Sequence, residues 1–227
     1  MLFAILLIAL LAALYGPSLW VRSAMRRHSR EIEDMPGTGG ELAQHLIERF
    51  ELDGVKVEEA SAGNDHYDPT NQTVRLSPEH LNGKSLTAIA IAAHEVGHAI
   101  QFARQEPISR IRGRWIPPAL ALRKSGILLL STVPLLAAVV RVPPFIVAAV
   151  TCGLALQLIG ALMYLIVLPE EWDASFNKAL PILEEGYLPE HHVPAVREVL
   201  RAAAMTYFAG ALADLLNVAR WIMVLRR

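Results

Sequence analysis

The stretch Leu86–Ala103 reads LTAIAIAAHEVGHAIQFA, an alanine-rich apolar segment interrupted by HEVGH. Its composition predicts a buried helix, and Ser85 stands directly before it as a suitable N-cap residue. His94 and His98 are four residues apart, so both imidazoles leave the same face of that helix. Polar groups in a buried helix need partners. The pattern therefore predicts a site of chemical function on this helix.

Two neutral imidazoles at this spacing can bind one zinc ion, so the motif predicts Zn2+ as cofactor with His94 and His98 as ligands. Glu95 is turned about 100° from His94 around the helix axis and can reach a zinc-activated water without ligating the metal. With Glu95 as general base, this arrangement hydrolyses peptide bonds. Gly97 lowers helix propensity by about 1 kcal/mol relative to alanine, which indicates a close approach of the metal or of another element.

A catalytic zinc site needs a third protein ligand and an open position. Residues 101–109 contain no histidine, and the next acidic cluster follows the third apolar run of the chain. A membrane hairpin would return that cluster toward the HEVGH helix, and the small Ala174 would permit close helix approach. This favours Glu171 as the third ligand, and the alternatives are Glu170, Asp173, His191 and His192.

Hydrophobic residues make up 53% of the chain, above the roughly 45–50% of soluble proteins. The excess lies in apolar runs long enough to span a membrane as helices. The second and third runs flank a proline-containing turn and predict a transmembrane hairpin. The fourth is interrupted by Asp214, Asn217 and Arg220. We expect about four transmembrane helices, at residues 1–21, 125–140, 144–168 and 202–225.

Basic residues follow the first run, beginning at Arg22, and further arginines precede the hairpin. The positive-inside rule then places these flanks, and the catalytic part, in the cytoplasm. We expect an integral multi-pass protein of a bacterial-type cell membrane. The formal net charge of -1 gives no reason to expect a nucleic-acid partner. Cys152, the only cysteine, lies in an apolar run and is expected to be a small buried hydrophobe.

The polar sequence predicts a small α+β portion. An amphipathic helix is expected from Thr38 to Phe50, and residues 55–58 and 73–76 alternate as strands of a small β-ribbon. The fold class is a mainly α membrane protein with a zincin-like α+β catalytic portion made of this ribbon and the HExxH helix. The expected divisions are an N-terminal anchor at 1–21, the catalytic part at 31–118, the hairpin at 125–168, a third-ligand insert at 169–201 containing a helix over 170–183, and a fourth membrane helix at 202–225.

Several segments together resemble one family, the YugP-type neutral zinc metallopeptidases of membranes. These segments are Asp65–Pro69, Val74–Ser77, Ala93–Gln101, Leu168–Ser175 and Ala204–Ala209. Their order is similar to that of HtpX-like and CAAX prenyl protease-like gluzincins, in which the glutamate of a Glu-x-x-Ala-Asp motif is the third ligand. The resemblance puts that role on Glu171, with Ala174 matching. Ser175 stands where those relatives have Asp, so that only a hydroxyl is available to orient a ligand.

The resemblance implies two further roles. An edge strand beside the zinc helix binds substrate backbone in gluzincins, and Thr73–Ser77 is the candidate here. A donor beyond the third-ligand helix stabilises the oxyanion of the tetrahedral intermediate, and Tyr207 is the candidate catalytic residue. An aromatic residue at the membrane interface is the alternative interpretation of Tyr207. His66 is expected to stabilise a turn of the ribbon rather than to orient substrate.

These features predict a membrane-bound zinc metalloendopeptidase whose active site lies at the cytoplasmic membrane face. Its substrates would be polypeptides, chiefly membrane proteins or membrane-proximal segments, and its other partner is the lipid bilayer. The main alternative is a non-catalytic structural or regulatory zinc-binding membrane protein with a closed four-ligand site. A transporter component is a third hypothesis, which depends on the polar face formed by Asp214, Asn217 and Arg220.

Overall fold

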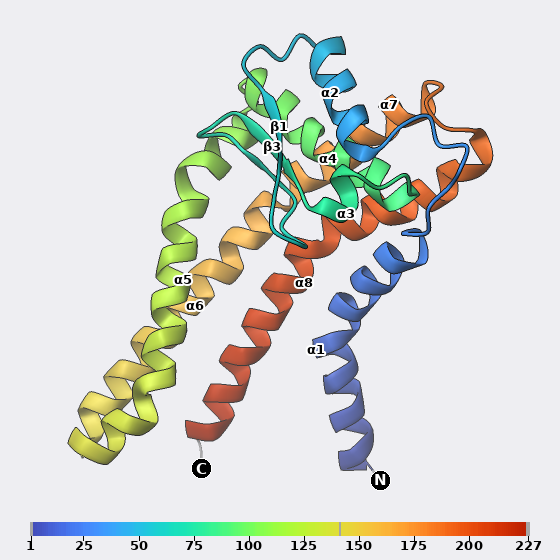
Figure 1. Cartoon of the computed structure of the whole chain (residues 1–227). Coiled ribbons are helices and arrows are strands. Elements are labelled where there is room, and N and C mark those ends of the chain that lie inside the picture. Colours follow the sequence, from blue (N-terminus) through green and yellow to red (C-terminus); the bar gives the residue numbers. More distant parts are fainter. Residues whose placement is uncertain (1, 141, 226–227) are drawn as a thin grey trace. The chain divides into compact units, whose positions relative to one another are not determined.

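The structure is a computed structural model that describes residues 2–140 and 142–225, without the side chains of 217–225 and of several residues before Tyr15. It divides into two compact units, one from residues 1–16, 111–167 and 207–227, the other from 17–110 and 168–206. Four long helices contribute to both units (Figure 1), namely α1 (Leu2–Arg27), α5 (Pro107–Val140), α6 (Pro143–Asp173) and α8 (Val193–Leu225). We call the unit that contains residues 111–167 the hydrophobic unit and the unit that contains residues 17–110 the polar unit.

The polar unit is built around α4 (Leu86–Ala103), the helix that carries HEVGH. Every residue of α4 from Leu86 to Gln101 is buried, as the apolar composition predicts. The Ser85 hydroxyl accepts a hydrogen bond from the Ala88 amide at 3.1 Å and caps the helix. Helix α2 (Gly39–Arg49) packs on α4 through its buried apolar side. A capping box formed by Thr38 and Glu41 starts α2 where the sequence predicts it.

A small three-stranded sheet covers part of α4. It consists of β1 (Lys56–Glu59), β2 (His66–Asp68) and β3 (Thr73–Leu76), in the order β1-β3-β2. Strand β1 is parallel to β3, whereas β2 is antiparallel to it. The turn between β2 and β3 is closed by Asp68, whose carboxylate accepts from the Thr70 amide at 2.9 Å. The two expected strands are present, but the element is a mixed sheet with a third strand rather than a ribbon.

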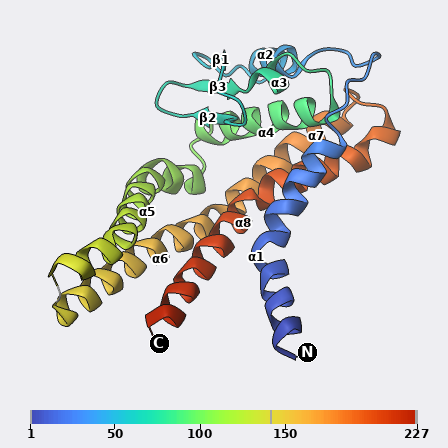
Figure 2. The ribbon, with the colours of Figure 1, turned by 60° about the horizontal axis from the view of Figure 1, so that its bottom comes forward.

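The prediction that Thr73–Ser77 provides an exposed strand edge is wrong. Strand β3 is the central strand, because β1 pairs with one of its edges and β2 with the other. The outer strand that packs against α4 is β2, as Figure 2 shows. Strand β2 has only three residues, too few for alternation of polar and apolar residues to indicate a strand.

The chain that follows the hairpin is one continuous helical stretch. Helix α6 runs through Pro169 to Asp173, a π-helical segment η1 (Ala174–Ala179) follows, and α7 (Leu180–Glu184) completes it. The helix predicted over residues 170–183 is therefore present, but it extends the preceding apolar helix instead of standing alone. Two short helices, α3 (Pro78–Leu81) and the 3-10 helix η2 (Glu190–His192), complete the chain.

Three helical stretches of the described residues are long and apolar enough to cross a membrane, by length and composition. They are Pro107–Val140, Pro143–Glu184 and Glu190–Leu216. The first two contain the predicted hairpin, in which α5 and α6 approach closely at Gly126 and Gly153. A Cβ atom at Gly126 would lie 2.8 Å from the Gly153 carbonyl oxygen, which explains the small residues. Helix α1 has 26 residues, and its crossing of a membrane stays a prediction.

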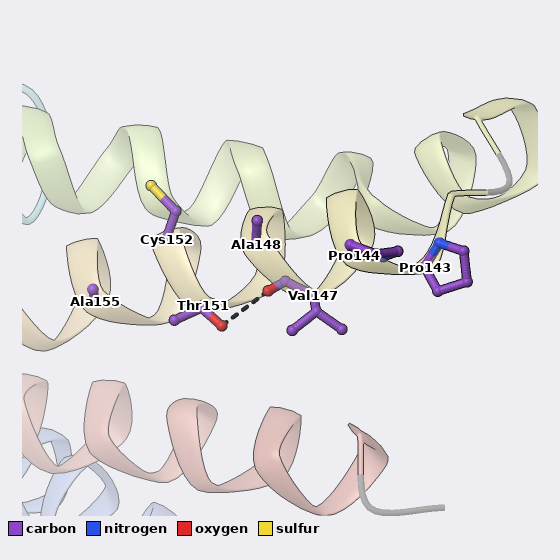
Figure 3. Close-up of a pocket in the computed structure, with 7 residues that line it drawn as sticks. All are labelled: Pro143, Pro144, Val147, Ala148, Thr151, Cys152 and Ala155. Carbon is purple, nitrogen blue, oxygen red and sulfur yellow. Dashed lines mark hydrogen bonds between the residues drawn. The ribbon is translucent and has the colours of Figure 1, made fainter.

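The prediction that Cys152 is buried is wrong, since this side chain is exposed. Cys152 lies with Ala148 along a shallow apolar groove of α6 with a volume of about 790 Å3 (Figure 3). An apolar residue of a membrane helix can face lipid as readily as a protein core, so an apolar run alone does not predict burial within the protein.

Asp214 is buried in the hydrophobic unit and is not an open polar face. Its carboxylate accepts from Arg123 Nε at 2.5 Å and from Arg123 Nη2 at 2.8 Å, a bidentate pair. Gly160 makes room for the arginine, because a Cβ there would meet the Arg123 side chain at 2.7 Å. The side chains of Asn217 and Arg220 lie outside the described residues. This pairing weakens the transporter hypothesis.

Candidate zinc site

The structure brings His94, His98 and Glu171 together into one buried group. Their ligand atoms all lie within 4.8 Å of one another. Glu171 Oε2 is 3.2 Å from His94 Nε2 and 3.3 Å from His98 Nε2. The exposed fractions of the three residues are 4%, 2% and 1%. Two histidines from α4 and one carboxylate from α6 therefore converge on a single point.

Hydrogen bonds fix the tautomer of His98. Gln101 Nε2 donates to the Glu170 carbonyl oxygen at 3.0 Å and to the Asp173 carboxylate at 2.8 Å. Because both partners are acceptors, the amide oxygen of Gln101 must be the atom that lies 2.9 Å from His98 Nδ1. His98 Nδ1 then carries the proton and donates it to Gln101. The Nε2 atom of the neutral ring keeps its lone pair for a metal.

The same reasoning applies to His94. The Ser175 hydroxyl donates its single proton to the Leu200 carbonyl oxygen at 3.1 Å, and its oxygen lies 3.0 Å from His94 Nδ1. His94 Nδ1 must therefore donate to Ser175, and Nε2 again carries the lone pair. The serine therefore orients the His94 ring through a hydrogen bond and brings no charge. Ser175 is 0% exposed.

This donor set fits zinc. Two imidazole nitrogens with available lone pairs and a carboxylate oxygen face one point, where mutual repulsion favours a cation between them. Ligands held about 2 Å from a tetrahedral zinc ion lie about 3.3 Å apart, close to the 3.2 and 3.3 Å separations of Glu171 from the histidines. Imidazole nitrogen and carboxylate oxygen are both ligand types that zinc binds. His94, His98 and Glu171 would hold the ion.

Close contact between α4 and η1 positions the two halves of the site. A Cβ atom at Gly97 would lie 2.9 Å from the Ala174 carbonyl oxygen and 3.4 Å from its Cα. Gly97 and the small, fully buried Ala174 therefore let the helix of Glu171 approach α4. The π-helical segment begins at Ala174, directly after the turn that carries Glu171, and such segments are frequent at functional sites.

Glu95 lies beside His94 on α4 and is 7% exposed. Among the described residues, the group that could hold a metal ion consists of His94, His98 and Glu171, and Glu95 does not belong to it. That position, next to a ligand but not itself a ligand, is compatible with a general base. Its role stays a prediction.

The other candidates for third ligand have different surroundings. The Glu170 backbone and the Asp173 carboxylate both hold Gln101, and Asp173 also binds Lys178. His191 and His192 lie in η2, where their rings contact each other at 4.0 Å between centroids.

Tyr207 belongs to the hydrophobic unit. Arg112 Nη2 donates to its hydroxyl oxygen at 2.9 Å, and the Tyr164 ring packs edge-on at 5.5 Å between centroids. These contacts fix the orientation of Tyr207 within its own unit.

One feature escapes sequence reasoning. Gln101 orients His98 and ties it to the helix of Glu171. Its signal is a fully buried amide three residues after His98, in a helix that is otherwise apolar.

His66 lies in β2 and its Nδ1 is 2.8 Å from the Asn64 carbonyl oxygen, a local bond that suits a structural role at the start of the strand.

The turn between β2 and β3 contains an ion pair between Asp68 and Arg75. Although burial acts to raise the pKa of Asp68, hydrogen bonds from Asn71, Arg75 and backbone amides lower it to about 2. Arg75 is 2.5 Å from the Asp68 carboxylate. The turn between β2 and β3 is thus held by an ionised carboxylate.

The chain thus combines a buried His–His–Glu donor set that fits zinc with three helical stretches long and apolar enough to cross a membrane. The family model described as "Putative neutral zinc metallopeptidase" matches residues 2–226, and the chain belongs to this family. The chain is similar to "Putative membrane protease YugP" of Bacillus subtilis (strain 168), with 33% identity over 236 residues, covering 99% of this chain and 96% of that protein. No solved structure matches the chain. The family is one of zinc proteins, so zinc is the cofactor, and the membrane location in the relative's description agrees with the three apolar helical stretches of this chain.

Proposed function

We propose that the protein is a membrane-bound zinc metalloendopeptidase. The observation that carries this proposal is the buried group of His94, His98 and Glu171, with the carboxylate of Glu95 on the next position of the same helix. When bound, zinc supplies a Lewis acid that polarises the scissile carbonyl and makes a water molecule nucleophilic near neutral pH. Glu95 accepts the proton of the attacking water and then delivers it to the leaving amine. Gln101 and Ser175 keep both histidines in the ligating tautomer.

Strand β2 is the proposed edge for binding the substrate backbone. It is an outer strand of the sheet and packs against α4, whereas the other outer strand, β1, packs against α2. An extended peptide that adds to β2 would pass along the helix that carries His94 and His98. This replaces β3, whose two edges are already paired.

Tyr207 is the proposed donor to the oxyanion of the tetrahedral intermediate. Its support is the family resemblance, in which a donor beyond the third-ligand helix stabilises the oxyanion.

The active site is proposed to lie at the cytoplasmic face of the membrane in a multi-pass protein. Support comes from the arginines that follow the N-terminal apolar run and those that precede the hairpin. Membrane proteins or membrane-proximal segments would then be the substrates that reach it.

The test is proteolysis of a denatured protein by detergent-purified wild type beside Glu95→Gln, with zinc measured on both. Glu59→Gln, an exposed glutamate of β1, is the matched control. Wild type and Glu59→Gln should cleave, while Glu95→Gln should keep one zinc per chain and lose cleavage by at least about 100-fold. Undiminished cleavage by zinc-loaded Glu95→Gln would overturn the mechanism.

A structural zinc protein remains the competing function. It would require a closed site with four protein ligands, and within the described residues the metal-binding group contains three. Zinc-loaded wild type that binds but never cleaves peptides would favour this alternative.

A further inference from the structure

A second cavity lies in the polar unit, beside the substrate edge proposed above. It has a volume of about 410 Å3 and is bordered by the loop from α2 to β1, by β2 and its following turn, and by the end of α4. The lining residues that matter here are Glu51, Asp53, Tyr67, Gln72 and Phe102. None of them takes part in the zinc site.

The polar side chains of this cavity lack protein partners. Tyr67 is 7% exposed, and its hydroxyl makes no hydrogen bond to any residue that the structure describes. The hydroxyl oxygen is not among the fully buried unpaired atoms of the described residues, so it is open to the cavity or to solvent. The side chains of Glu51, Asp53 and Gln72 are exposed and likewise make no hydrogen bond within the described part of the chain. Four polar groups therefore border this space and are available to a ligand.

The chemistry of the lining selects a cation. The Tyr67 and Phe102 rings pack at 5.5 Å between centroids and offer aromatic surface to a cation. Two carboxylates, an amide oxygen and a phenol oxygen supply acceptors. No lysine, arginine or histidine is part of the lining, although Lys56 and Arg104 are next in sequence to lining residues. A long aliphatic side chain that ends in a positive charge would contact both the aromatic rings and the oxygen acceptors.

The position of the cavity ties it to a bound peptide. Phe102 follows His98 by four residues on α4, so the cavity begins about one helical turn, roughly 6 Å, from a zinc ligand. Tyr67 is the middle residue of β2. A peptide paired with the outer edge of β2 would therefore carry one of its side chains to this cavity.

We propose that the cavity is a specificity subsite that binds a lysine or arginine side chain of the substrate, close to the scissile bond. The aliphatic part of that side chain packs on Phe102 and Tyr67, and its charged end binds Glu51 and Asp53. This inference rests on the proposed peptidase function, because it assigns the substrate that the zinc site would cleave.

Binding without turnover tests the subsite directly. Full-length, zinc-loaded Glu95→Gln in detergent is titrated with fluorescein-labelled alanine-rich peptides that carry lysine, arginine or norleucine at the centre, and anisotropy gives Kd. We expect the lysine and arginine peptides to bind about tenfold tighter than the norleucine peptide. The added pair Glu51→Gln and Asp53→Asn should abolish this difference. The added pair Glu33→Gln and Asp34→Asn removes two exposed charges of the same unit elsewhere and should preserve it.

Equal affinity for the three peptides, or a preference that survives Glu51→Gln and Asp53→Asn, would overturn the proposal. Mapping of the sites that wild type cleaves in denatured casein separates this failure from failure of the function. Cleavage without a basic residue at any fixed position leaves the peptidase and removes the subsite. A preference for basic peptides in binding, with no cleavage by wild type, leaves the cationic subsite and removes the peptidase.

Discussion

Ser175 Oγ accepts a hydrogen bond from His94 Nδ1 at 3.0 Å while it donates to the Leu200 carbonyl oxygen at 3.1 Å. The hydroxyl can do both only when His94 Nδ1 carries the proton, so a neutral side chain sets the tautomer of a zinc ligand. The site therefore does not need a carboxylate at this position.

Replacement of Ser175 by alanine should weaken zinc binding by roughly 10- to 100-fold, because His94 loses the partner that orients its ring. Competition with a chromophoric chelator measures this affinity. Ser85→Ala is the control, since Ser85 caps the same helix without contacting a ligand. That variant should lose about 1 kcal/mol of stability and keep its zinc affinity. Unchanged zinc affinity in Ser175→Ala would refute the role assigned to the serine.

Gln101→Leu should lower the free energy of unfolding by about 2–4 kcal/mol and also weaken zinc binding. The change leaves the His98 Nδ1 proton and the Glu170 carbonyl oxygen buried without the amide that satisfies them. Thermal unfolding in detergent, with and without zinc, measures both effects. Gln44→Leu removes an exposed hydrogen bond to Glu48 and should change stability by less than about 0.5 kcal/mol. Similar stability losses in the two variants would contradict this account of Gln101.

Gly97→Ala should destabilise the protein by about 1–3 kcal/mol and lower its zinc content, although alanine is the better helix former. The new Cβ would press on the Ala174 backbone and move the helix of Glu171 away from the histidines. Zinc content and the unfolding temperature provide the readouts. Gly16→Ala, where a Cβ meets nothing within 4 Å, should be neutral or stabilising. A fully zinc-loaded, more stable Gly97→Ala would show that the contact is not tight.

Asp68 should stabilise the sheet in a pH-dependent way. Its pKa is lowered from 3.8 to about 2 in the folded protein, so the ionised form is favoured by folding. This stabilisation is fully present above pH about 4 and is lost as the pH falls toward 2. Urea unfolding of the metal-free protein should therefore separate wild type from Asp68→Asn most at pH 7. A difference that grows on acidification would contradict the assignment.

The sequence predicts the site better than the sheet. HEVGH and the acids after the hairpin indicate the residues that the fold brings together, because ligand chemistry restricts their types and helix geometry restricts their spacing. The order of the strands does not follow from the sequence in the same way. Strand β2 is three residues long, and β1 and β3, which pair in parallel, pack against α2 and α4.

Three further features differ from what the sequence predicts. Arg123 looks like part of a basic flank, yet it binds Asp214, which lies 91 residues later in the chain. Cys152 looks like a core residue, yet it is exposed on an apolar helix. Helix α6 continues through Pro169, although proline usually ends a helix. The Arg123–Asp214 contact is remote in sequence, so the local pattern does not predict it.

The most direct test of the zinc site is the zinc content of Glu171→Gln beside Glu170→Gln, both purified as full-length protein in detergent. The two glutamates are neighbours and almost equally buried, with 1% and 0% exposure, but only Glu171 reaches both histidines. Wild type and Glu170→Gln should each hold one zinc ion per chain, and Glu171→Gln should hold little or none. A full complement of zinc in Glu171→Gln, or its loss in Glu170→Gln alone, would contradict the assignment of Glu171 as the third ligand.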